Sequence, residues 1–169
     1  MKSMKSMKKP LTMAAALMVL TGSLLAANPG TALAASPPCW EEYQIHAPTS
    51  GDGNRKAIEM PVDDDASPDW RCRMWQGMGW SVGTYQLQRT LNSCYYSRVN
   101  VIGAMLAVDG NFGPRTKAAL VKVQQYHRIT ADGIYGPQTA STIVHEARSD
   151  ASGWSVYCGL TAREAGLLS

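Results

Sequence analysis

The side chains that most often carry catalysis or hold metals are few in this sequence and lie far apart. Its three histidines, His46, His127 and His145, do not form a zinc-binding motif. The acidic run Asp63–Asp65 lacks the alternating oxygen ligands and the turn glycine of a calcium loop, which favours a solvated loop over a calcium site. The pattern therefore predicts no metal, no cofactor and no catalytic constellation.

The four cysteines, Cys39, Cys72, Cys94 and Cys158, are better candidates for disulfides than for metal ligands. No two of them stand at C-x-x-C spacing, and an even number is typical of disulfide bonding in exported chains. Four cysteines allow three pairings, and the residues alone do not choose among them.

The most distinctive pattern is a motif that occurs twice. Asp109–Thr116 reads DGNFGPRT, and Asp132–Thr139 reads DGIYGPQT. In each copy Asp-Gly favours a tight turn, and the proline suits the first position of a helix because it has no N–H to leave unpaired. The aromatic residue, Phe112 or Tyr135, can anchor the turn in a core. No residue of the motif is a nucleophile paired with a base, so a structural role explains the motif.

Helices are expected to hold these turns in place. Helical periodicity before the first copy puts four residues on one face: Thr84, Leu87, Gln88 and Leu91. The two motif prolines predict helices from residue 114 to about 127 and from residue 137 to about 148. Residues 36–79 are rich in Pro, Gly and Asp and are expected to be loops, and residues 149–169 are expected to form a C-terminal tail.

Residues 1–35 have the order of a secretory signal peptide. Four early lysines precede an apolar run, Leu11–Ala27, and a small-residue cleavage pattern, Ala32–Ala34. The apolar run is shorter than the roughly 20 residues of a membrane-spanning helix, so we expect secretion and no stable membrane insertion.

Loss of that segment would change the charge of the protein. The chain has 16 Lys and Arg against 13 Asp and Glu, and without the four leading lysines the balance is 12 against 13, or −1. Residues 36–79 carry −4 and residues 80–148 carry +4, which marks a boundary near residue 80. A mature protein without net positive charge gives no support to nucleic-acid binding.

Across residues 80–148 the order of motifs resembles the bacterial peptidoglycan-binding domain. The carriers are L-Q-x-x-L from Leu87, V-D-G-x-F-G-P-x-T-x-x-A from Val108, V-Q at Val123, and A-D-G-x-Y-G-P-x-T from Ala131. Where that family usually has glycine, this chain has Arg128. The resemblance implies an all-α fold, in which two related halves pack as a small three-helix bundle that adheres to cell-wall peptidoglycan.

The resemblance also implies a disulfide pairing and a set of ligand contacts. Because the ends of such a bundle lie close together, it implies Cys72–Cys158, which leaves Cys39–Cys94. Aromatic rings can stack on sugars, and arginines can bind the carboxylates of the peptides. The candidate contacts are Asp109, Phe112, Arg115, Gln124, Tyr126, Arg128, Asp132 and Tyr135.

Each candidate contact also has a structural interpretation. The aromatic residues of the motif suit the core, the two aspartates suit the turns, and Gln88 and Gln124 suit hydrogen bonds to backbone inside the bundle. We expect a secreted, cell-wall-associated monomer that binds peptidoglycan and is not an enzyme. The alternatives are a small cell-wall hydrolase and an accessory or inhibitor protein, either using the bundle as a targeting module. Residues 36–79, with His46, are too short to form a catalytic core of their own.

Overall fold

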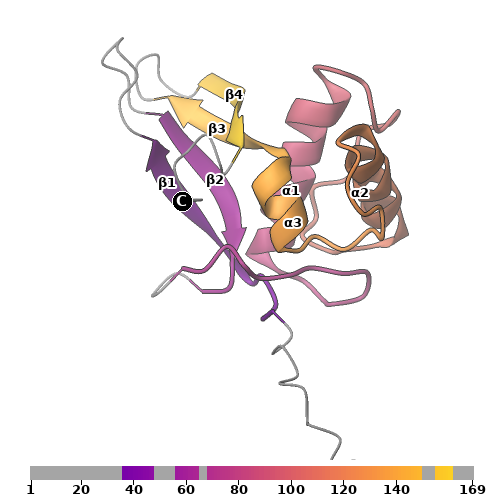
Figure 1. The fold of residues 1–169 in the computed structure, drawn as a ribbon, viewed down its shortest axis with the longest axis horizontal. Coiled ribbons are helices and arrows are strands. Elements are labelled where there is room, and N and C mark those ends of the chain that lie inside the picture. The colour runs from indigo at the N-terminus through magenta and orange to yellow at the C-terminus, as the bar shows by residue number, and fades with distance from the viewer. Residues whose placement is uncertain (1–35, 48–55, 65–67, 150–154, 162–169) are drawn as a thin grey trace, which may run out of the picture. The chain divides into compact units, whose positions relative to one another are not determined.

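The computed structural model describes residues 36–47, 56–64, 68–149 and 155–161, all within the unit Ala34–Ser169. The expected signal peptide lies outside the described residues. Four strands are present among the described residues: β1 (Glu41–Ala47), β2 (Lys56–Val62), β3 (Val144–Ser149) and β4 (Ser155–Thr161). They form one antiparallel sheet in the order β1-β2-β3-β4, and the helices lie beside it (Figure 1).

The expected all-α three-helix bundle is therefore wrong. The segment expected to be loops contributes β1 and β2, and the segment expected to be a tail contributes β4. The central pairing joins β2 to β3 across almost ninety residues, with Ile58 opposite Ala147. The alternation of Ile58, Met60 and Val62 fits a strand, but the strand is short and contains Pro61, and its partner in the sheet lies far away in the sequence.

The third helix ends earlier than the sequence predicts. Helix α3 covers Pro137–Thr142, not residues 137–148, and its C-cap residue Ile143 is already extended, with ψ of 154°. Thr142, Ile143 and Val144 are β-branched in succession, which disfavours helix and suits a strand. The chain therefore leaves α3 and enters β3 directly.

The other two helices agree with the sequence pattern. Helix α1 covers Val82–Thr90, is capped by the Ser81 hydroxyl, which accepts from the Thr84 N–H at 3.0 Å, and continues into a π-helical turn, η1 (Leu91–Tyr96). Helix α2 covers Pro114–Tyr126 with its proline at the start. The four residues predicted to share the inner face of α1 are all buried.

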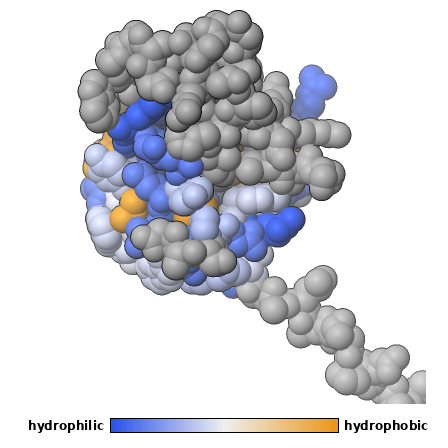
Figure 2. Space-filling model, turned by 90° about the vertical axis from the view of Figure 1, so that its left-hand side faces the viewer, coloured by the Kyte–Doolittle hydropathy of each residue, from blue (hydrophilic) through white to orange (hydrophobic). Residues whose placement is uncertain are grey.

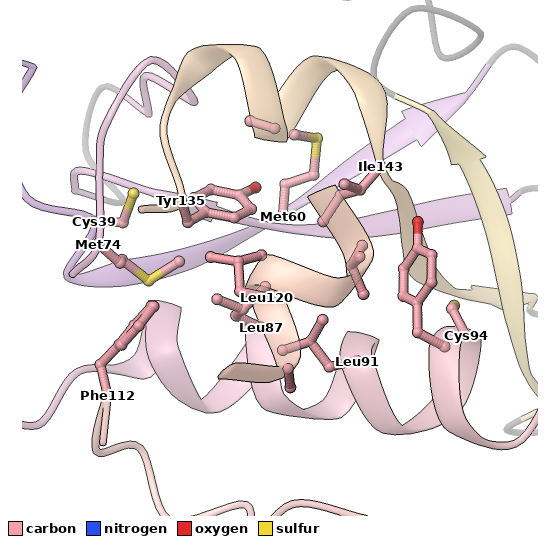
Figure 3. Close-up of a cluster of buried hydrophobic side chains, with 14 of the residues drawn as sticks. Cys39, Met60, Met74, Leu87, Leu91, Cys94, Phe112, Leu120, Tyr135 and Ile143 are labelled. Atoms are coloured by element: carbon pink, nitrogen blue, oxygen red, sulfur yellow. The ribbon is translucent and has the colours of Figure 1, made fainter. Parts of the chain in front are cut away.

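One hydrophobic core is shared by the helices and the sheet. Leu87 and Leu120 come from α1 and α2, Met60 comes from β2, and Phe112 and Tyr135 enter from the two motifs (Figure 3). Tyr135 is fully buried and Phe112 almost so, which confirms their role as anchors of the turns. The described residues visible from the sheet side are mostly hydrophilic (Figure 2). The apolar side chains of β2 thus lie inside, and the sheet is part of the domain core.

Charged side chains also join α1 to the sheet. Arg89 of α1 forms ion pairs with Glu59 of β2 and Glu146 of β3, and Arg148 forms another with Glu59 at 2.5 Å. Both glutamates are almost fully buried, and each has at least one arginine partner. Loss of Arg89 would leave the buried Glu146 carboxylate without its arginine partner, which is costly, so this pair fixes α1 against the sheet.

The disulfides are Cys39–Cys72 and Cys94–Cys158, so the expected pairing of Cys72 with Cys158 is wrong. Cys39 donates its backbone N–H to the Arg73 carbonyl at 3.0 Å, which holds two extended segments together next to the first bridge. Cys158 lies on β4, and β4 packs against η1, where Cys94 lies. The cause of the error is the strand β4, which brings the C-terminal cysteine to η1.

Candidate functional site

The first motif is held by a glutamine from the preceding helix. Gln88 of α1 donates its Nε2 to the Asp109 carboxylate at 2.9 Å, the Asn111 carbonyl at 3.0 Å and the Thr116 hydroxyl at 3.2 Å. Its Oε1 accepts the backbone N–H groups of Asp109 at 3.0 Å and Gly110 at 2.9 Å. One buried side chain therefore ties the turn to the start of α2.

The second motif repeats this arrangement. Gln124 of α2 donates its Nε2 to the Asp132 carboxylate at 3.2 Å, the Ile134 carbonyl at 2.9 Å and the Thr139 hydroxyl at 3.0 Å. Its Oε1 accepts the Gly133 N–H at 2.9 Å. The Asp-Gly turn and the motif threonine thus serve as two copies of one clamp, in which glutamine is the central residue.

Burial divides the eight candidate contacts into two groups. Phe112, Gln124 and Tyr135 are buried, so a ligand on the surface would not reach them. The other five are exposed and remain candidates for binding: Asp109, Arg115, Tyr126, Arg128 and Asp132. The structure does not bring these five to one place, because Asp109 and Arg115 lie at the start of α2 and Tyr126 and Arg128 at its end.

A groove of about 370 Å³ opens at the first motif. We call it the first-repeat groove, and its polar lining residues include Asp109, Asn111, Arg115 and Thr116. The Asn111 backbone N–H and the Gln88 amide donate to the Asp109 carboxylate and lower its pKa. The groove therefore presents a fixed carboxylate, an amide and a guanidinium, which are groups that hydrogen-bond sugars and peptides.

Trp80 lies next to residues that line this groove, although its spacing with Trp70 and Trp75 in the sequence favours packing over a sugar-binding role. Its side chain is 60% exposed. A Cβ on Gly110 would lie only 2.4 Å from the indole Nε1, so the ring lies directly over this glycine, whose φ of +73° also disfavours a side chain. Trp80 also forms a β-bridge with Asn111. The sequence carries no signal for this position, because the contact joins Trp80 to a glycine thirty residues away.

The second motif offers a different surface. Lys117 covers Gly133 as Trp80 covers Gly110, since its Cγ lies 2.6 Å from the position of an added Cβ. Ile134 and Gln138 stand where the first motif has Asn111 and Arg115. The scaffold is thus repeated, but the exposed tryptophan ring and the combination of Asp109 with Arg115 occur at the first copy.

Two kinds of feature are absent from the described part of the chain. No group of three or more His, Cys, Asp or Glu side chains there is arranged to hold a metal ion. None of the helices described is long and apolar enough to cross a membrane.

Comparison with known proteins agrees with the geometry of the repeats. Residues 82–143 match the family described as "Putative peptidoglycan binding domain", which confirms the resemblance inferred from the motifs. A zinc D-Ala-D-Ala carboxypeptidase from Streptomyces albus G is 54% identical over 41 residues, which make up 24% of this chain. That match spans only 16% of the relative. No solved structure is significantly similar to the chain.

Proposed function

We propose that this protein, whose residues 82–143 match the peptidoglycan-binding family, holds peptidoglycan in the first-repeat groove and does not cut it. The observation that carries the proposal is the exposed Trp80 ring beside the polar groove at Asp109. A sugar ring can stack on the indole while its hydroxyls bond to the carboxylate and to Asn111. The Arg115 guanidinium, which also lines the groove, adds donors for the oxygen atoms of the sugar.

The test is co-sedimentation of the mature protein with insoluble peptidoglycan, with chitin and cellulose as controls. Because exposed tryptophans at binding sites often contribute about 2 kcal/mol or more, Trp80→Ala should weaken binding roughly thirtyfold. The matched control is Lys117→Ala, which removes the residue that covers the turn in the second repeat and should change binding less than about twofold. Failure of the unaltered protein to sediment with peptidoglycan would overturn the proposal.

We also propose that the protein acts outside the cell, attached to the wall. The support is the signal-like order of residues 1–35 together with the disulfides Cys39–Cys72 and Cys94–Cys158, since such bridges persist in oxidising compartments. The test is to look in the culture medium and in the wall fraction for a chain that has been cleaved after residue 34 or 35.

A hydrolase is the second candidate, and the name of the carboxypeptidase relative is what favours it. The only histidine in residues 36–79 is His46, which lies on β1. A clearing zone in a gel that contains peptidoglycan, abolished by His46→Ala, would replace the binding proposal with a catalytic one.

A further inference from the structure

A second cavity lies at the other end of α2 from the first-repeat groove. It has a volume of about 320 Å³, and we call it the α2 C-terminal pocket. Its walls include Tyr95, Tyr126, His127 and the Cys94–Cys158 disulfide. The start and the end of α2 are separated by about 18 Å at 1.5 Å per residue. The pocket and the groove share no lining residue, so they are separate sites.

The aromatic wall of this pocket is held in a fixed arrangement. The Tyr95 hydroxyl accepts the Val144 N–H at 2.8 Å and lies 2.7 Å from Nε2 of His127. Burial raises the pKa of Tyr95 and lowers the pKa of His127, which favours the uncharged form of both groups. Tyr126 stands edge-on to both rings, at centroid distances of 6.4 Å and 5.2 Å.

Arg98 supplies the charge of the pocket. Among the described residues that line the pocket, Arg98 is the only Lys, Arg, Asp or Glu. Its guanidinium is exposed, and within the described residues it forms no ion pair or side-chain hydrogen bond. Val99 and Val144 add apolar surface. A guanidinium without an ion-pair partner among the described residues, next to apolar and aromatic walls, can bind a carboxylate that is attached to small apolar groups.

We propose that the α2 C-terminal pocket binds the carboxylate end of a peptidoglycan stem peptide, with Arg98 as the partner of the carboxylate. The inference rests on the proposed function, since it assigns the peptide to this pocket and the glycan to the first-repeat groove. The groove has the carboxylate and the amide that sugar hydroxyls need, whereas the pocket combines a single cation with apolar and aromatic walls.

The test compares two synthetic peptides that end in D-Ala-D-Ala, one with a free C-terminal carboxylate and one with an amide, by titration calorimetry on the disulfide-bonded protein. The unaltered protein should bind the free acid at least about tenfold more tightly than the amide. Arg98→Gln should abolish that difference. Arg71→Gln removes an exposed arginine outside both sites and should preserve it. Equal binding of acid and amide, or an unchanged preference in Arg98→Gln, would overturn the assignment.

Glycan strands stripped of their peptides separate this inference from the proposed function. Binding to stripped glycan without binding to either peptide would overturn the peptide pocket and leave the groove in place. Acid-selective peptide binding that Arg98→Gln removes, without retention on stripped glycan, would support the pocket and overturn the groove as a glycan site. Tyr126→Phe keeps the aromatic ring and should therefore retain the preference for the acid. Retention of this preference would show that the aromatic wall remains folded in the variant.

Discussion

The two glutamine clamps should contribute equally to stability, although they lie in different halves of the repeat. In Gln88→Leu the lost interactions are five hydrogen bonds of 2.9–3.2 Å, and in Gln124→Leu they are four of 2.9–3.2 Å. Leucine fills a similar volume, so the loss is mainly polar. Each such bond contributes about 1 kcal/mol net, less where water can replace it, and a buried N–H left unpaired costs about 1–3 kcal/mol. Each variant should therefore lose about 3 kcal/mol.

Urea unfolding at neutral pH, with both disulfides intact, measures this loss. The midpoint should fall while the slope stays constant, because the folded and unfolded states keep their exposed surfaces. Gln125→Leu is the matched control: it is exposed and adjacent to Gln124, and its free energy of unfolding should change by less than about 0.5 kcal/mol. A loss below about 1 kcal/mol in Gln88→Leu, or a large loss in only one of the two clamps, would refute the repeat as two equivalent clamps.

Gln88→Glu gives an independent measure of the same clamp. The introduced carboxylate can still accept the two backbone N–H groups of the turn, but its second oxygen faces the Asp109 carboxylate instead of donating to it. The variant should be less stable than the unaltered protein at neutral pH, and the difference should narrow as acid protonates the introduced group. If the difference in stability between the two proteins does not depend on pH, the destabilisation comes from packing and not from loss of the Gln88 amide donor.

Three further predictions concern single residues. Burial lowers the pKa of His145 to about 4, so in acid the unfolded chain takes up a proton that the native state does not. The free energy of unfolding should therefore fall by about 3 kcal/mol as the pH drops from about 6.5 to about 4. In urea unfolding, His145→Leu should remove this dependence of stability on pH. Gly110→Ala should displace the Trp80 ring and weaken peptidoglycan sedimentation, whereas Gly136→Ala, with nothing within 4 Å of an added Cβ, should leave sedimentation unchanged. Arg128 has a φ of +58°, so Arg128→Gly should raise the free energy of unfolding by about 1 kcal/mol in the same assay, and a loss instead would show that the arginine side chain stabilises the fold.

The sequence predicted the parts of the fold that local chemistry determines. Pro114 and Pro137 begin helices as expected, because a proline at the first helical position is a local preference. Arg128 follows α2 in the left-handed conformation that explains the usual glycine there, and Ile129 donates its N–H to the Gln124 carbonyl at 3.0 Å in the pattern of a Schellman cap.

The strands were missed because distant pairing determines them. The sequence of β3, VHEARS, contains residues that also suit a helix, and β2 contains Pro61, which argues against a central strand. Their pairing in the sheet overrides both preferences. The sequence favoured packing for Trp80 for a related reason: the place of its ring depends on the position of Gly110 in the fold, and thirty residues separate the two in the chain.

The sheet bears on binding because it completes the domain that carries the groove. Gln88 positions the turn of the groove, and one residue later Arg89 pairs with buried glutamates on β2 and β3. Met60 of β2 and Leu87 of α1 belong to the same hydrophobic core, and α1 packs against β2 (Figure 3). The placement of α1, and through Gln88 the shape of the groove, therefore depends on strands outside the matched residues 82–143. The loop-rich segment and the tail expected from the sequence therefore fold together with residues 82–143 in one compact unit.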